Sequence, residues 1–270
     1  MSQTKLRLAI LDMNNNVPNR GLANIKQIVS QFADKIDFEV FDVRHRAEIP
    51  FIDFDVYISS GGPGSPLEGD GNWDTQWFNL VNRIYTHNLY SADKKYFFFI
   101  CHSFQMACIY FKIGRISKRP YMSFGTYPVY KTDDGEAETL FQQLPDPFYI
   151  ADFRHWQVVQ PDAEVLAELD AKVLAIEQLT PLPERAIMAV RFSDEFVGTQ
   201  FHPEADALGM LDYFQQEERK QQVLAEHGEN IYRQMIKDLY APQRIDLTQR
   251  IILPTFLKTC LQKLEQPVVV

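Results

Sequence analysis

The chain has 270 residues, 46% of them hydrophobic, which is enough to bury one substantial core. The net charge of −9 at pH 7, with no basic run, argues against nucleic acid as a partner. Residues 1–5 are short and polar and no apolar run is long enough to span a membrane, so we expect neither a targeting segment nor a membrane anchor. An odd number of cysteines without metal-ligand spacing favours a reduced, cytoplasmic location; they are Cys101, Cys108 and Cys260.

The first part of the chain alternates apolar strands with helical stretches. We predict strands at residues 6–13, 37–43 and 56–60, and a helix at 22–33 between the first two. Such alternation indicates βαβ units and a mostly parallel sheet flanked by helices, that is, an α/β fold. Ligands of such sheets bind at the carboxyl ends of the strands.

A glycine-rich loop, Gly61-Gly62-Pro63-Gly64, follows the third of these strands. Glycines let backbone N–H groups approach a ligand closely. The loop lacks the Gly-Lys-Ser/Thr ending of a phosphate-binding loop, so an oxyanion hole fits better. An ordinary glycine-rich turn is the alternative.

Cys101 stands at a predicted strand-to-helix turn. A helix at residues 73–90 leads into the apolar strand 96–100, and a second helix is expected from Phe104 onward. A thiol in this position feels the positive end of the helix dipole, which favours the nucleophilic thiolate. The alternative is that Cys101 is a small buried core residue, as most cysteines are.

The second part of the chain reads as antiparallel structure that covers one side of the site. Asp-Gly and proline turns separate short strand-like runs at 128–131, 148–152, 157–159 and 173–177, and a further strand at 186–190 is followed by a hairpin-like stretch at 193–198.

His202 and Glu204 follow that last strand in the sequence Phe201-His202-Pro203-Glu204. Pro203 keeps His202 out of the α region, so we expect an extended segment in which the two side chains share one side. Glu204 would then accept the Nδ1 proton of His202 and leave Nε2 to face a nucleophile.

The remainder of the chain is helical and charged. We predict helices at 213–227, 230–239 and 247–264, broken at Gly228 and Pro242 and kinked at Pro254. The last helix has an apolar stripe that needs a cover, either the rest of the chain or a second copy in a homodimer: Ile251, Ile252, Leu253, Phe256, Leu257 and Cys260. We therefore expect a domain at 1–207 and a helical extension at 208–270.

Together the three motifs resemble the class I (triad) glutamine amidotransferase family. That family carries a Gly-Gly-Pro-Gly oxyanion loop, a Gly-x-Cys-x-Gly-x-Gln elbow and a Phe-His-Pro-Glu motif, here in the same order. The resemblance runs from about residue 6 to residue 206 and is closest to the domain of GMP synthase and its stand-alone relatives. The stretches 123–129 and 153–156 match the family's spacing as well. The resemblance implies a flavodoxin-like sheet.

The resemblance also implies roles for individual residues and no need for a metal or organic cofactor. Cys101 would attack the side-chain amide of glutamine or of a γ-glutamyl compound, with His202 and Glu204 completing the triad. The N–H groups of Gly62 and His102 would form the oxyanion hole. The substrate would be held by Gly64, Gln105, His155 and Trp156.

The elbow departs from the family at two positions. Phe99 stands where the family has the glycine before the cysteine, and Ser103 where it has the glycine after. Small residues there let strand and helix cross closely at a strained turn. Ser103 is small enough, whereas Phe99 requires either a relaxed turn or a ring turned aside, and a displaced thiol would miss the oxyanion hole.

Three functions follow from these observations. The first is release of ammonia from glutamine through a γ-glutamyl thioester, with a separate synthase subunit as acceptor, because the chain has no recognisable synthase half. The second is a γ-glutamyl peptidase or hydrolase. The third, which Phe99 favours, is a catalytically weak binding or regulatory protein.

Overall fold

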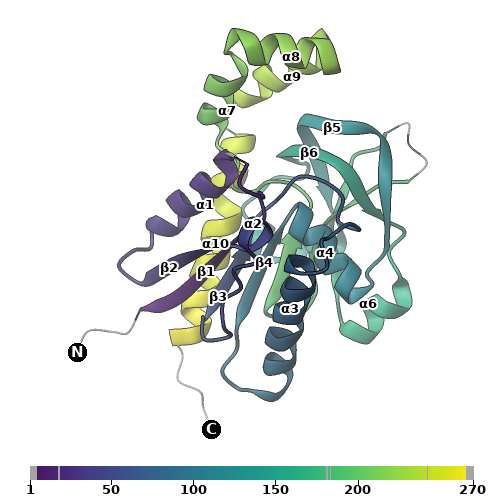
Figure 1. The fold of residues 1–270 in the computed structure, drawn as a ribbon. Helices are drawn as coiled ribbons and strands as arrows, with labels where there is room; N and C mark the ends of the chain where they lie inside the picture. The colour runs from purple at the N-terminus through teal and green to yellow at the C-terminus, as the bar shows by residue number, and fades with distance from the viewer. Residues whose placement is uncertain (1–4, 18, 181, 183, 242, 266–270) are drawn as a thin grey trace.

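The computed structural model describes residues 5–17, 19–180, 182, 184–241 and 243–265. Parallel pairing joins the strands of one half of its central sheet (Figure 1), in the spatial order β2 (Ile36–Asp42), β1 (Leu6–Asp12), β3 (Val56–Ser59), β4 (Tyr96–Ile100) and β9 (Phe196–Thr199). The carboxyl ends of these strands therefore meet at one edge. This is the edge where the glycine-rich loop, Cys101 and the His-Pro-Glu segment leave the sheet.

Antiparallel pairing joins the other half, which continues outward from β9 as β8 (Ile187–Arg191), β7 (Lys172–Glu177), β5 (Arg115–Lys131) and β6 (Phe148–Val159). The short runs predicted at 128–131, 148–152 and 157–159 are parts of the two long strands β5 and β6. Charged residues such as Asp152 and Arg154 interrupt the apolar pattern of β6, but they are buried and paired, so the strand continues through them. The short helices α5 (Asp133–Ala137), η1 (Thr139–Phe141) and α6 (Ala163–Leu169) connect this half.

The two faces of the parallel strands bury different helices because successive side chains alternate sides. On one face, Ile58, Phe98 and Ile100 pack into a cluster with α1 (Arg20–Ser30) and α10 (Ile245–Glu265). On the other face, Phe97 and Phe99 pack with α3 (Trp73–Tyr90) and α4 (His102–Phe111). The mixed α/β fold with helices on both faces is the one expected from the sequence.

The C-terminal helices divide into two groups. Helices α7 (Ala207–Phe214), α8 (Glu217–His227) and α9 (Glu229–Leu239), here called the helical cap, project beyond the sheet near β5 and β6 (Figure 1). The helix predicted at 213–227 is wrong at its start, because the chain leaves the helix between α7 and α8. Pro242 lies outside the described residues, and Pro254 lies within α10.

Helix α10 returns to the sheet and supplies the cover that its apolar stripe required. Ile252, Leu253 and Leu257 are fully buried, and the Phe256 ring meets Phe98 of β4 edge-on with centroids 5.2 Å apart. The stripe is therefore buried within the chain itself. Within the described residues, no helix is both long enough and apolar enough to cross a membrane.

Candidate active site

Cys101 occupies a strained turn between β4 and α4. Its backbone angles are φ 50° and ψ −100°, a conformation that L-residues rarely adopt outside functional sites. The Cys101 N–H donates to the carbonyl of Thr199 at 2.8 Å, and its carbonyl accepts from the N–H of Gln105 at 3.0 Å. Helix α4 thus begins directly after the cysteine, two residues earlier than predicted. The thiol is held at the helix N-terminus with 6% of the residue exposed.

The two departures in the elbow are accommodated without relaxing this turn. The Phe99 ring is turned aside onto the α3 face, where it stacks on Phe97 with centroids 4.2 Å apart and meets Trp77 edge-on. The Ser103 hydroxyl accepts from the N–H of Ile100 at 2.9 Å and donates to the carbonyl of Ser59 at 2.7 Å. Ser103 therefore ties the elbow to β3 with contacts that a glycine could not make.

His202 and Glu204 form the expected contact, although by a different backbone path. The His202 Nδ1 lies 2.8 Å from Glu204 Oε1. The segment is not extended as predicted, because the N–H of Ala205 donates back to the His202 carbonyl at 3.2 Å and closes a turn. Glu204 is 2% exposed, and its second oxygen has no partner among the described residues. The only side-chain partner of the Glu204 carboxylate among the described residues is thus the His202 imidazole.

Gly61 fixes how closely the histidine approaches the cysteine. A Cβ at this position would lie 2.7 Å from His202 Cε1 and 3.4 Å from Cys101 Cβ. Burial opposes the charged form of His202, but the Glu204 carboxylate and the Cys101 sulfur outweigh it and hold the pKa of His202 well above 6.5. The imidazole is therefore ready to be the cationic partner of a thiolate.

The glycine-rich loop lies against the end of β1 and is held by Arg44 of α2 (Val43–Arg46). A Cβ at Gly62 would lie 2.2 Å from the carbonyl oxygen of Met13, so only glycine fits there. The Arg44 guanidinium donates to the carbonyl of Pro63 and stacks 4.8 Å over the Trp73 ring. Sequence reasoning missed Arg44, since it comes from a different part of the chain.

His102, the other expected oxyanion donor, is the first residue of α4, where backbone N–H groups lack intrahelical partners. Its side chain is buried, and burial together with the nearby Arg44 charge lowers the pKa of His102 to about 3. The ring is therefore neutral and does not titrate near neutral pH.

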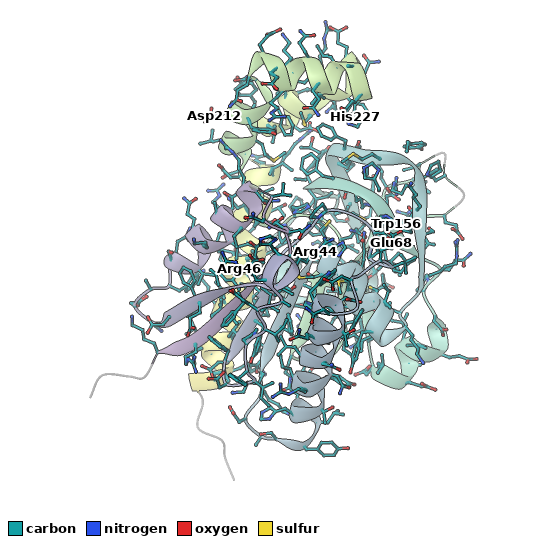
Figure 2. The ribbon with its side chains drawn as sticks, in the orientation of Figure 1. Arg44, Arg46, Glu68, Trp156, Asp212 and His227 are labelled. Carbon is teal, nitrogen blue, oxygen red and sulfur yellow. The ribbon has the colours of Figure 1, made fainter. Side chains whose placement is uncertain are left out.

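Two cavities meet at Cys101. One, of about 320 Å³, is lined by all four residues expected to hold the substrate, which are Gly64, Gln105, His155 and Trp156. The other, of about 410 Å³, is lined by His202 and Glu204 and by residues of α1 and α7. Figure 2 shows Trp156 and Arg44 in the body of the molecule, apart from the helical cap that carries Asp212 and His227.

Gln200 links the cysteine to the smaller cavity. Its Nε2 points toward the Cys101 sulfur at 3.9 Å, and its Oε1 accepts from Gln105 Nε2 at 3.0 Å. Gln105 Nε2 also donates to the carbonyl of Trp156 at 3.0 Å. Gln200 was missed in the sequence, although it stands two residues before His202.

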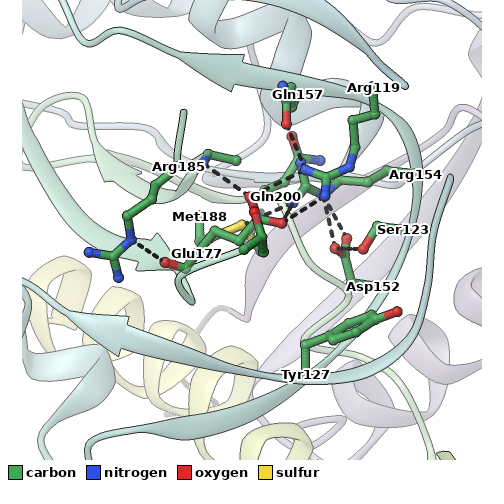
Figure 3. Close-up of polar contacts among 12 residues, drawn as sticks. Arg119, Ser123, Tyr127, Asp152, Arg154, Gln157, Glu177, Arg185, Met188 and Gln200 are labelled. Atoms are coloured by element: carbon green, nitrogen blue, oxygen red, sulfur yellow. Dashed lines mark hydrogen bonds and ion pairs between the residues drawn. The ribbon is translucent and has the colours of Figure 1, made fainter. Parts of the chain in front are cut away.

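A buried ion network supports the strand behind the smaller cavity (Figure 3). Arg154 Nε lies 2.9 Å from an Asp152 oxygen, and Arg154 Nη2 lies 3.0 Å from Glu177 Oε1. Arg119 pairs with the same carboxylate of Glu177, and Ser123 donates to Asp152 at 2.6 Å. Burial works against the charge on Arg154, but the two carboxylates overcome it and raise the pKa of the guanidinium. The sequence signal that could have predicted this network is the presence of charged residues, such as Asp152 and Arg154, within otherwise apolar strands.

A family model supports what the fold and the three converging motifs indicate. The model for class I glutamine amidotransferases matches residues 18–210. The chain belongs to the class I glutamine amidotransferase family.

Solved structures show the same fold at low sequence identity. A glutamine amidotransferase from Thermotoga maritima is 16% identical, with a TM-score of 0.70 over 98% of this chain and 100% of that one. One from Methylobacillus flagellatus is 13% identical, with a TM-score of 0.69 over 98% and 97%. The glutaminase domain of CTPS from Trypanosoma brucei, with bound acivicin, is 13% identical, with a TM-score of 0.59 over 98% and 96%. No curated protein sequence matches this chain.

Proposed function

We propose that the protein hydrolyses the γ-amide of glutamine, or of a γ-glutamyl compound, through a thioester on Cys101. The thiolate attacks the amide carbon, and the imidazolium of His202, held by Glu204, donates its proton to the leaving nitrogen. Backbone N–H groups of Gly62 and His102 stabilise the oxyanion. Water then attacks the thioester, with His202 as base, and releases glutamate.

One observation carries this proposal. Cys101 keeps the strained conformation of a nucleophile despite Phe99, and Gly61 brings His202 against it while Glu204 binds the far side of the ring. A buried carboxylate lies 2.8 Å from a half-buried histidine beside a strained cysteine. Backbone strain and paired titratable groups of this kind cluster at functional sites, which favours an enzyme over a protein that retains only the fold.

The ammonia released from glutamine would pass to a separate synthase subunit. In support of this, members of the family couple glutamine hydrolysis to synthesis. A second candidate, γ-glutamyl hydrolysis without an acceptor, is favoured by the helical cap, which helps to enclose the space beside His202.

The decisive test combines turnover with covalent labelling. The wild-type chain should release glutamate from glutamine or a γ-glutamyl amide, and Cys101→Ser should release none. A chloroketone analogue of glutamine should label Cys101 in preference to Cys108 and Cys260, since burial raises the pKa of both those thiols. Equal labelling of all three cysteines, or full activity in Cys101→Ser, would refute the proposal.

A further inference from the structure

Cys101 divides the space at the sheet edge into two chambers. The chambers share the walls Gly62, Pro63, Cys101 and Phe153. His202 and Glu204 line only the larger chamber. The smaller chamber is lined instead by the residues that the family resemblance assigns to the substrate, which are Gly64, Gln105, His155 and Trp156.

The position of the proton donor decides which part of a substrate enters which chamber. When an amide is cleaved, the leaving nitrogen must receive its proton from His202 and so must lie on the side of the imidazole. The γ-glutamyl group then lies on the opposite side of the sulfur, in the smaller chamber. The larger chamber is the place for the leaving amine.

That chamber is far larger than ammonia needs. A molecule of the size of water or ammonia takes up roughly 30 Å³, whereas the chamber measures about 410 Å³. Its volume falls within the range of pockets that hold organic ligands, about 300–1,000 Å³. If glutamine were the only substrate, most of this space would have no occupant.

Helix α7 gives the chamber an apolar wall with a fixed position. Met210, Tyr213 and Phe214 face the chamber. Phe214 stacks on Phe153 with centroids 6.1 Å apart. Arg20 of α1 donates to the carbonyl of Gly209 at 2.5 Å and so ties α7 across the chamber to the opposite wall.

The charges that line the chamber disfavour a second carboxylate. Glu204 and Asp206 line the chamber, and so do the cations Arg20 and protonated His202, of which His202 is paired with Glu204 at 2.8 Å. The Arg20 guanidinium is already held by the Gly209 carbonyl and lies 6.0 Å from the centroid of the Tyr213 ring. The carboxylate of a leaving amino acid would therefore meet two carboxylates and, among the described lining residues, two cations that already have partners.

We propose that the preferred substrate is the γ-glutamyl amide of a primary amine that bears an aromatic or branched apolar group and no carboxylate. Tyr213 and Met210 then determine specificity for the leaving amine. The inference rests on the proposed function and names its substrate class. The C–S bond forms by addition of the thiolate to the amide carbon, and the C–N bond then breaks as His202 protonates the amine. Water next forms the C–O bond of glutamate as the C–S bond breaks, and His202 returns the proton to the sulfur.

Four compounds with one glutamyl group test this: glutamine, γ-glutamylethylamide, γ-glutamylphenethylamide and γ-glutamylphenylalanine. Burial of the phenyl group predicts a kcat/KM for the phenethylamide roughly 10- to 100-fold above that for glutamine. The ethylamide should fall between them, and γ-glutamylphenylalanine, with the same ring plus a carboxylate, should fall well below the phenethylamide.

A matched pair of variants locates the effect. Tyr213→Ala should reduce the ratio of phenethylamide to glutamine kcat/KM about tenfold. Tyr90→Ala removes the same side chain from the C-terminal end of α3, where the residue is 86% exposed, and should leave the ratio unchanged. Circular dichroism of both variants checks that the helical cap is folded.

Equal kcat/KM for glutamine and the phenethylamide, preference for γ-glutamylphenylalanine, or a ratio that Tyr213→Ala does not change would overturn the inference. In each of these cases the chloroketone would still label Cys101 and glutamyl amides would still be cleaved, so the proposed function would survive. If no compound reacts and Cys101 is not labelled, the proposed function fails, and the inference that rests on it fails with it.

Discussion

Phe99 and Gly198 lie directly opposite each other on the neighbouring parallel strands β4 and β9. A Cβ at Gly198 would lie 2.9 Å from both the Cβ and the carbonyl oxygen of Phe99, and 3.0 Å from the Phe104 ring. The large residue on the elbow strand is therefore matched by the absence of a side chain on its partner. Gly198 on β9 thus supplies the space that the family's glycine at position 99 would have supplied on β4.

Gly198→Ala should destabilise the protein by about 1–3 kcal/mol, because the added methyl overpacks a rigid contact between strands. Activity should fall further than stability alone explains, since Cys101 lies only two residues beyond Phe99. Gly71→Ala is the contrast: its positive φ of 76° brings backbone strain, but no atom lies within 4 Å of the new methyl. Urea unfolding and turnover of both variants measure the difference, and equal activity losses would contradict the prediction.

His202→Ala should be more damaging than Glu204→Gln. Removal of the imidazole abolishes proton transfer to the leaving nitrogen, an effect of roughly 10²–10⁴-fold on kcat. Glutamine at position 204 keeps a hydrogen-bond acceptor at the 2.8 Å contact and removes only the charge. Steady-state kinetics on one γ-glutamyl substrate compare the two, and a larger loss in Glu204→Gln would reverse the roles assigned here.

Gly21→Ala should separate stability from activity. Alanine favours the α1 helix by up to about 1 kcal/mol over glycine. Its methyl would nevertheless lie 2.7 Å from Oδ1 of Asn19, which caps α1 through the Gly21 N–H, and 2.9 Å from Glu204 Oε1, the oxygen that binds His202. Because the disturbed cap offsets the gain in helix propensity, we expect a small net change in stability but a clear loss of kcat, whereas Gln27→Ala on the exposed side of the same helix should change neither. Unaltered kcat in Gly21→Ala would show that Glu204 does not depend on this packing.

The raised pKa of His202 predicts how stability depends on pH. Burial lowers this pKa, but Glu204 and Cys101 raise it by more, so the folded state binds the proton more tightly than the unfolded state. The stabilisation is complete below about pH 6.5 and is lost as the pH rises through the folded-state value. The advantage of the wild type over His202→Gln in urea unfolding should therefore shrink between pH 6 and pH 9. An advantage that grows with pH would mean that the pKa is lowered instead. His102, with a pKa near 3, does not titrate in this window.

The bounds of helices and strands could be predicted from the sequence where one hydrophobic periodicity was strong. The helix at 73–90 and the strand at 96–100 have the predicted bounds, because amphipathic and fully apolar periodicities are strong there. The motifs also indicated which residues would gather at the sheet edge. Sequence reasoning failed where long-range partners decide the outcome. Asp152 and Glu177 balance the charge of Arg154 inside its strand. Arg20 of α1 holds α7, from which Tyr213 faces the site.

The contact of Phe256 with Phe98 shows which length of chain is needed to cover the sheet. The family model matches up to residue 210, yet the α10 residues that close one face of the sheet lie more than forty positions later. A chain cut at the family boundary would keep Cys101, His202 and Glu204 but leave the apolar side of β4 open to water. The segment that the family model matches and the segment needed to bury the core are therefore different lengths of the same chain.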